Sequence, residues 1–182
     1  DVIKKESEKA DFIHSEFKRL GRKVTPAGVV STLAGTGSIG SANGTGTAAS
    51  FNTPSGLAVD VSGTVYVADN ANHCVRKITS AGVVSTWAGS ITGASGLTNG
   101  VGTSAMFNGP VGLALDQSGH LFVSEEQNHT IRKIDHCAVV STWAGTGVSG
   151  HADGTGINAT FNQPTGVSID SVGNLYVADT GN

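Results

Sequence analysis

The sequence is poor in cysteine and charge, and it lacks any long apolar run. Its two cysteines, Cys74 and Cys137, are too few for a disulfide framework and form no C-x-x-C pair for a metal or redox site. No run of about eighteen apolar residues occurs, so we expect no membrane insertion. A net charge of −3 gives no strong attraction to nucleic acid or to anionic lipid.

Glycine, by contrast, is abundant, and the sequence around it repeats. The chain has 26 glycines in 182 residues, a composition that suits many tight turns between short strands. The segment Val29–Gly35 recurs at Val83–Gly89 and at Val139–Gly145, at spacings of 54 and 56 residues. A second segment also occurs three times, as Phe51–Asp60, Phe107–Asp116 and Phe161–Asp170. This period predicts a repeat architecture in which each unit needs a neighbour to bury its apolar faces.

Each repeat is predicted to contain four short β-strands. In the first complete copy they are GLAVD, TVYVAD, CVRKI and VVSTWAG, separated by turns that contain glycine or serine. Both alternating faces are largely apolar, so each sheet is expected to be covered on both sides. Length varies between copies only in the loops 36–50, 90–106 and 146–160, which keeps the strands in register. We therefore predict an all-β fold built from four-stranded β-propeller blades.

The repeats resemble the NHL repeat family. The resemblance is carried by the pattern G-L-A-V-D…V-Y-V-A-D…N-H-x-V-R-K-I, which fits Gly56–Ile78 and, with substitutions, Gly112–Ile134. It implies that propeller blades occupy residues 18–182. The expected divisions are strands three and four of a blade at 18–35, complete blades at 51–89 and 107–145, and strands one and two of a blade at 161–182.

About three blades' worth of strands are thus expected, whereas the resemblance implies about six blades for closure. We expect a segment of a longer propeller, completed by the missing blades of the same propeller. Pairing of two copies, a filament or an arc with unpaired edges are the alternatives. Residues 1–17 are charged and free of glycine, with apolar residues at roughly helical spacing. A short helical N-terminal extension is predicted there, with a solvated arm as the alternative.

Polar residues gather at one end of the predicted blades, on a surface that we call the loop rim. It consists of the three loops between blades and of the turns that follow each second strand. Loops on a rigid scaffold commonly carry binding residues. The candidate binding residues of the loop rim are Asp69, Asn72, His73, Glu125, Asn128, His129 and Asp179. The alternative is that these side chains build the blades, by bonding to backbone and packing between sheets.

No catalytic residue, metal ligand or cofactor is predicted. The histidines and carboxylates of the rim come from different blades and lack HxH or HExxH spacing. We expect a non-enzymatic scaffold for protein–protein or extracellular matrix interaction and assembly. A metal-dependent lyase or hydrolase that uses the rim is one alternative implied by the resemblance. An RNA-binding platform is another, but it would need a basic face.

Three Asn-x-Ser/Thr sequons begin at Asn43, Asn128 and Asn158. They are candidate glycosylation sites, and with them we expect an extracellular or cell-surface location. Trp87 and Trp143 are expected to pack between blades near the rim, with stacking against a sugar as the alternative. The expected partners are therefore other protein chains and glycans, with no nucleic acid.

Overall fold

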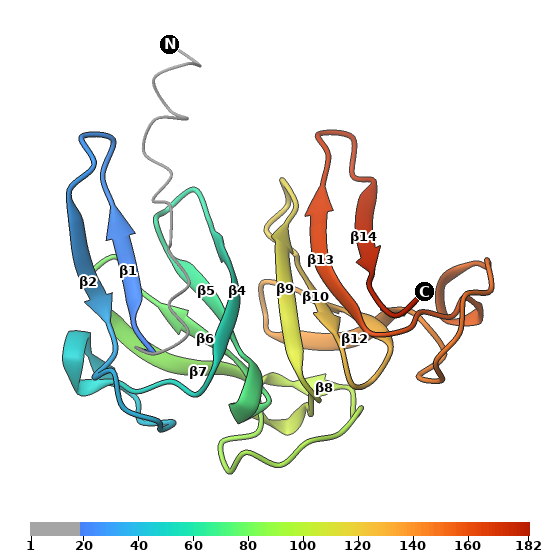
Figure 1. Cartoon of the computed structure of the whole chain (residues 1–182), viewed down its shortest axis with the longest axis horizontal. Coiled ribbons are helices and arrows are strands. Elements are labelled where there is room, and N and C mark those ends of the chain that lie inside the picture. The colour runs from blue at the N-terminus through green and yellow to red at the C-terminus, as the bar shows by residue number, and fades with distance from the viewer. Residues whose placement is uncertain (1–18) are drawn as a thin grey trace.

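A computed structural model describes residues 19–182, so the helix predicted at 1–17 lies outside the described residues. Four antiparallel sheets stand side by side in chain order and fan out as an arc (Figure 1). The strands are Gly21–Val24 (β1), Val30–Ala34 (β2), Gly44–Thr45 (β3), Pro54–Val59 (β4), Val65–Asp69 (β5), Cys74–Ile78 (β6), Val83–Gly89 (β7), Gly100–Val101 (β8), Pro110–Leu115 (β9), Leu121–Glu125 (β10), Thr130–Ile134 (β11), Val139–Ala144 (β12), Pro164–Ile169 (β13) and Leu175–Asp179 (β14).

The only helices in this described part are short 3-10 turns, and none of them is long and apolar enough to cross a membrane. Blade 2 consists of β4 to β7 and blade 3 of β9 to β12, each with neighbouring strands antiparallel. Blade 1 is represented by β1 and β2, and blade 4 by β13 and β14. The predicted all-β propeller segment of four-stranded blades is therefore confirmed. The 3-10 turns are Gly46–Ala48 (η2), Asn70–Asn72 (η3), Gly102–Ser104 (η4) and Gly156–Asn158 (η5).

Blades 2 and 3 each carry a fifth, two-residue strand that the sequence did not predict. β3 pairs with β7, and β8 pairs with β12, at the outer edge of each sheet. The loop then crosses to the preceding blade, because the Gly35 amide donates to the Gly46 carbonyl oxygen over 3.0 Å. Gly46 itself donates to Gly82 over 2.9 Å, with a φ of +57° that favours glycine. Loop 36–50 therefore fastens the outer strands of two neighbouring sheets.

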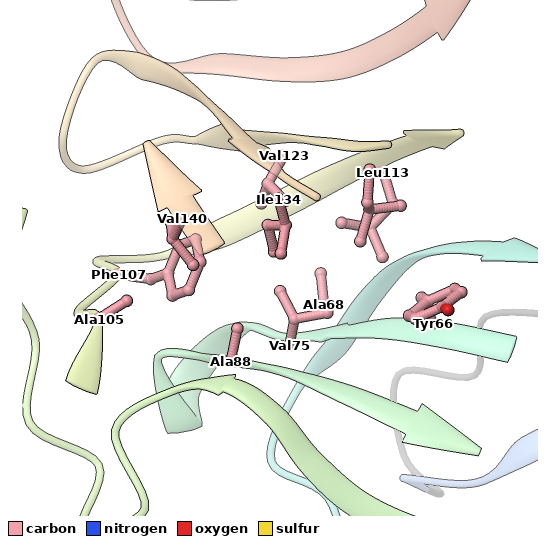
Figure 2. Close-up of a cluster of buried hydrophobic side chains, with 11 residues drawn as sticks. Tyr66, Ala68, Val75, Ala88, Ala105, Phe107, Leu113, Val123, Ile134 and Val140 are labelled. Atoms are coloured by element: carbon pink, nitrogen blue, oxygen red, sulfur yellow. The ribbon is translucent and has the colours of Figure 1, made fainter. Parts of the chain in front are cut away.

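The core lies between the sheets rather than within one of them. Figure 2 shows side chains of blade 2, such as Val75 and Ala88, pointing toward Ile134 and Val123 of blade 3. These four side chains are fully buried. Burying one large aliphatic side chain contributes about 1.5–3 kcal/mol, so each interface between blades stabilises both of its sheets. The prediction that every blade needs a stacked neighbour is met here.

The innermost strands approach one another so closely that only glycine fits. A Cβ added at Gly56 of β4 would lie 2.2 Å from the Val111 carbonyl oxygen of β9. One added at Gly112 would lie 2.2 Å from the Thr165 carbonyl oxygen of β13. At Gly166, the equivalent position in blade 4, the nearest atom among the described residues is 3.6 Å away. The repeated glycine thus marks contact between the backbones of adjacent blades.

Candidate functional site

The β1–β2, β4–β5, β9–β10 and β13–β14 turns lie on one side of the arc, and the loops between blades lie on the other (Figure 1). The loop rim therefore has the position that the sequence predicted. η3 follows β5 at this end, and β3, β8 and the other 3-10 turns belong to the loops between blades. The residues of the rim can be considered blade by blade.

In blade 2, the last residue of β5 is a wholly buried aspartate. One carboxylate oxygen of Asp69 accepts the Asn52 amide N–H at 2.7 Å. The other accepts bonds from the Asn72 side-chain amide and from Arg76 Nη1, both at 2.8 Å. The relative side-chain exposure of Asp69 and Arg76 is 0%. A ligand in solvent therefore meets the loops that surround this carboxylate and not the carboxylate itself.

Arg76 also bonds to the preceding loop, 36–50, so the ion pair helps to hold this loop in place. Its Nη1 also donates to the Ser50 carbonyl oxygen over 3.1 Å, and its Nη2 donates to Ala42 over 3.1 Å. Nη2 further donates to Asn43 Oδ1 over 2.8 Å. The guanidinium lies over the Phe51 ring, 5.3 Å from the centroid. One arginine thus holds both halves of loop 36–50 against the sheet.

Blade 3 repeats this arrangement with a longer carboxylate. Glu125 Oε1 accepts the Asn108 amide at 2.7 Å and the Asn128 side-chain amide at 2.8 Å. Its Oε2 accepts from Arg132 over 2.9 Å and from the Thr130 hydroxyl over 3.1 Å. Arg132 then donates to loop 90–106, at the carbonyl oxygens of Thr98 and Met106 and the side-chain oxygen of Asn99.

Burial controls the ionisation of both carboxylates. It raises the pKa of Asp69 and of Glu125 above their ordinary values, against the opposing effects of the arginine and of the hydrogen bonds. Removing the arginine would leave the desolvation uncompensated, so the ion pair and the burial depend on each other.

The histidines of the rim connect neighbouring blades. His73 and His129 both adopt a left-handed backbone, with φ of 54°. Nδ1 of His73 accepts the Gly109 amide at 3.2 Å, and Nδ1 of His129 accepts the Gln163 amide at 3.1 Å. Burial lowers the pKa of His73, which favours the neutral ring that can accept this bond. The two rings lie in successive junctions between blades.

Asn72 and Asn128 hold the loops in the same way. Their side-chain amides donate to the carbonyl oxygens of Gly40 and Gly96, at 2.9 and 2.8 Å. In blade 4, Asp179 accepts the Asn162 amide at 2.7 Å and also the Asn182 side-chain amide. The structure therefore brings Asn72 to Asp69 and Asn128 to Glu125 within one blade, whereas His73 and His129 each bond to the next blade. Within residues 19–182 it forms no cluster of three His, Cys, Asp or Glu side chains suited to a metal ion.

The outward side of the rim displays aliphatic side chains that the sequence analysis did not single out. Leu97 and Ile157 line a hollow of about 420 Å³ between loops 90–106 and 146–160, together with Asn99, Thr142 and Thr146. Ile157 is 60% exposed. In the sequence, these residues could have been recognised as apolar residues within Gly/Ser/Thr-rich loops. The other exposed aliphatic residues of the loops are Ile39, Ile91, Val101 and Val148.

A second hollow lies on the side of the arc opposite the rim, between the β4–β5 turn of blade 2 and the β9–β10 turn of blade 3. It has a volume of about 740 Å³, and its lining includes Asp60, Tyr66 and Trp87. The Tyr66 and Trp87 rings contact each other, with centroids 4.6 Å apart. The prediction that Trp87 lies near the rim is therefore wrong. Trp143 is 49% exposed and packs against Phe122.

The three sequons differ in how their asparagines are engaged. Asn43 and Asn158 are exposed on the rim loops. The Asn128 amide nitrogen donates two hydrogen bonds, and Thr130 of the same sequon is buried. Glycosylation would modify this nitrogen, so a glycan at Asn128 would disrupt the pinning of loop 90–106.

Both cysteines have free thiols. Cys74 is buried, and its burial raises the pKa of the thiol to about 12, whereas Cys137 is exposed.

Comparison with known proteins matches residues 51–78, 107–134 and 161–182 to the NHL repeat. NHL repeat-containing protein 2 of Bos taurus is 35% identical over 150 residues, and the human protein of the same name is 33% identical over an equal length. The matched region is 74% of this chain but only 20% of either relative. The chloroplastic protein SUPPRESSOR OF QUENCHING 1 of Arabidopsis thaliana is 36% identical over 85 residues, which are 46% of this chain and 8% of that protein.

Two solved structures from Bacteroides thetaiotaomicron have the same fold. A structural genomics protein of unknown function superposes with a TM-score of 0.75 and 26% identity, covering 90% of this chain and 40% of the other. An auxiliary nutrient-binding protein superposes with a TM-score of 0.71 and 18% identity, covering 92% and 42%. The chain thus spans less than half of these proteins. With three repeats matched and the blades built from them, the chain belongs to the NHL repeat family and folds as a segment of its β-propeller.

Proposed function

We propose that this chain is a non-enzymatic scaffold that binds protein partners through its loop rim. The NHL-repeat propeller fold supports a protein-interaction scaffold in general. The observation that carries the proposal is that the rim has one set of side chains bonded inward and another exposed to solvent. The carboxylates of Asp69 and Glu125 are bonded inward to buried arginines, while aliphatic side chains such as Ile157 are exposed to solvent.

This division favours binding over catalysis. A general acid or base must reach the substrate, and both carboxylates are wholly buried in ion pairs. Loops that are already fixed lose little conformational entropy when a partner binds. Exposed apolar side chains on such loops are typical anchors of a protein interface. The hollow beside Leu97 and Ile157 suits one apolar side chain of a partner.

A selection with a phage-displayed peptide library tests the proposal. We expect peptides with an apolar anchor that bind the wild-type chain saturably and lose about tenfold or more in affinity to the variant Leu97→Asp/Ile157→Asp. The matched control is Val172→Asp, which places a charge on an exposed aliphatic site at the hairpin end. Peptides that bind all three proteins equally, or a selection that enriches nothing, would contradict the proposal.

We also propose an extracellular or cell-surface location, supported by the exposed sequons at Asn43 and Asn158. Expression through a eukaryotic secretory pathway is expected to attach glycans to Asn158 and Asn43 and not to Asn128, as peptide mapping by mass spectrometry would report. Secreted protein without any glycan would argue against this location, and a glycan on Asn128 would contradict its role in holding the loop.

A further inference from the structure

The hollow between blades 2 and 3, on the side of the arc opposite the loop rim, holds polar groups that the fold does not use. Its volume is about 740 Å³, and the Tyr66–Trp87 ring pair forms part of its wall. Small-molecule sites commonly have about 300–1,000 Å³, with aromatic walls and a few polar groups that fix the ligand. We propose that this hollow binds a pyranose ring of a carbohydrate, which stacks on Trp87 and hydrogen-bonds to Asp60 and Lys77.

The aspartate of the β4–β5 turn has one carboxylate oxygen that its own turn does not need. Oδ1 of Asp60 accepts the backbone amides of the turn, two bonds of 2.9 Å, whereas its Oδ2 accepts no hydrogen bond from any of residues 19–182. At Asp116, the equivalent Oδ2 bonds to His120 Nδ1 over 2.7 Å. At Asp170, it accepts from the Asn174 side chain over 2.8 Å. Of these three aspartates, Asp60 alone keeps an acceptor for a ligand, and it lines the hollow.

The phenol of Tyr66 adds a hydroxyl group to the same wall. Tyr66 lies at the opposite end of the buried cluster from Ala105 (Figure 2). Burial and the charge of Asp60 raise the pKa of Tyr66, so the phenol stays protonated and can donate to a ligand. Blade 3 has Phe122 at the equivalent position, so a blade of this repeat folds without the hydroxyl.

The lysine of the hollow is also available to a ligand. In blade 3 the ammonium of Lys133 lies over the Trp143 ring, 4.8 Å from its centroid. Lys77 and Trp87 hold the same positions in blade 2 and both line the hollow. Within the described part of the chain, however, Lys77 makes neither an ion pair nor a contact over an aromatic ring. Trp87 therefore keeps a ring surface that its own lysine does not cover.

Together these groups match a neutral ligand that carries several hydroxyl groups. A pyranose has an apolar C–H face that packs on an aromatic ring, and its hydroxyl groups donate to a carboxylate and accept from an ammonium at the same time. A ligand with a strong net charge would be repelled by either Asp60 or Lys77. Gln117 and Ser118, from the β9–β10 turn, add neutral polar groups on the other side of the hollow. Carbohydrate is the ligand class that uses all of these groups.

The two tryptophans of the chain make the site directly observable, because Trp87 lines the hollow and Trp143 does not. An array of free and protein-linked oligosaccharides is screened first, and a bound saccharide is then titrated while tryptophan fluorescence is recorded. We expect a saturable change in fluorescence that Trp87→Phe abolishes and Trp143→Phe retains. Hits among free sugars identify a free oligosaccharide as the source, and hits confined to protein-linked sugars identify a glycan of a partner protein; either supports the proposal.

An array on which no saccharide is bound overturns the proposal. A fluorescence change that persists in Trp87→Phe overturns it as well, because the saccharide would then bind beside Trp143. Circular dichroism that is unchanged in Trp87→Phe excludes unfolding as the cause of lost binding.

Two conservative variants test the polar contacts without disturbing the blade. Asp60→Asn keeps the oxygen that closes the turn and removes the charge, and Tyr66→Phe copies the residue of blade 3. We expect the affinity for the saccharide to fall about tenfold or more in Asp60→Asn and about fivefold in Tyr66→Phe. The matched controls are Asp170→Asn and Lys133→Ala, at equivalent positions outside the hollow, which should bind like the wild type. Equal affinities in all four variants would contradict the assigned contacts.

A competing ligand class is provided by amino acids and peptides, since a zwitterion can also pair with Asp60 and Lys77. Binding of free amino acids that Asp60→Asn weakens, in a chain that binds no saccharide, would overturn the proposal. The rim variant Leu97→Asp/Ile157→Asp should leave saccharide affinity unchanged, because its two sites lie on the opposite side of the arc. The carbohydrate site and the binding of protein partners at the rim can therefore fail separately.

Discussion

Blades 2 and 3 build the same arginine site with different residues. In blade 2, the short carboxylate of Asp69 accepts three bonds, and Cys74 occupies the first position of the following strand. In blade 3, the longer Glu125 accepts the equivalent bonds, and Thr130 replaces the cysteine and donates a fourth. The extra methylene of glutamate is thus accompanied by a hydroxyl that stabilises the same charge.

The junctions between blades show a second exchange, in which the hydroxyl donor comes from a different strand in each blade. In blade 2 the hydroxyl comes from β4, where Ser55 donates to the Val111 carbonyl oxygen over 3.1 Å. In blade 3 it comes from β10, where Ser124 donates to the equivalent carbonyl oxygen of Thr165. The residue of blade 2 that is equivalent to Ser124 is Ala68, and the residue of blade 3 that is equivalent to Ser55 is Val111. Each junction therefore has one hydroxyl donor at the same place, whichever strand provides it.

The two exchanges indicate that the repeat preserves the position of a charge or donor rather than the identity of a residue. Substitutions that remove such a group should be costly, and those that move it to its alternative strand should be tolerated.

The largest effect is expected from loss of the buried guanidinium. Arg76→Ala and Arg132→Ala should each lower the free energy of unfolding by about 3–5 kcal/mol, because a desolvated carboxylate is left without its ion pair. Arg76→Ala should cost more, since Glu125 keeps a donor in Thr130 that Asp69 lacks. Urea denaturation measures both values. Lys77→Ala, on the same strand as Arg76, is the control and should cost less than about 0.5 kcal/mol. Equal, small losses for both arginines would contradict the account.

A smaller loss is expected at the contact between innermost strands. Gly112→Ala places a Cβ 2.2 Å from a backbone oxygen, so the strands must separate, at a cost of about 1–3 kcal/mol or more. The control is Gly166→Ala, where the added Cβ would meet only Ala178, at 3.6 Å, and which should leave stability nearly unchanged. Thermal unfolding that ranks the two variants in the opposite order would show that the blades are not in contact there.

The hydroxyl exchange predicts a rescue. Ser55→Ala should destabilise the chain by about 1 kcal/mol, because the acceptors on the next blade lose their donor. Adding Ala68→Ser moves the hydroxyl to the strand that blade 3 uses and should recover most of this loss. A double-mutant cycle measures the coupling. Additive effects of the two substitutions would reject the exchange.

The fourth prediction concerns the reactivity of the two cysteine thiols and involves no change in stability. In the folded chain at pH 8, Cys137 should react rapidly with a thiol reagent, and Cys74 should be protected, because it is buried and its pKa is raised to about 12. Mass spectrometry of the labelled peptides separates the two sites. In urea both should react. Rapid labelling of Cys74 under native conditions would mean that blade 2 is not packed as described.

Much of the fold could be predicted from the sequence because the repeat fixes its own register. β6 and β7 have the bounds that the residues predicted, and β5 differs by one residue. The fifth strands could not be predicted, since a two-residue pair such as Gly100–Val101 has no alternation pattern and depends on the neighbouring sheet. Propensity also gave no indication of the left-handed backbone at His73.

The site was less accessible to sequence reasoning. Asp69 and His73 were predicted to share a rim, and they do, but binding and structural roles were both left open for these residues by the sequence. Deciding between them required the burial of Arg76 and its bonds to Ser50 and Ala42, which are 26 and 34 residues away in the chain. The hollow beside Ile157 depends on two loops that meet only in the folded chain.

The central claim is that each buried carboxylate–arginine pair holds the loop of its own blade. Hydrogen–deuterium exchange of Arg132→Ala against the wild type tests it most directly. We predict faster amide exchange in loop 90–106, whose carbonyl oxygens Arg132 binds, with unchanged protection in loop 36–50. Unchanged exchange in loop 90–106, or an equal loss of protection in both loops, would contradict the claim.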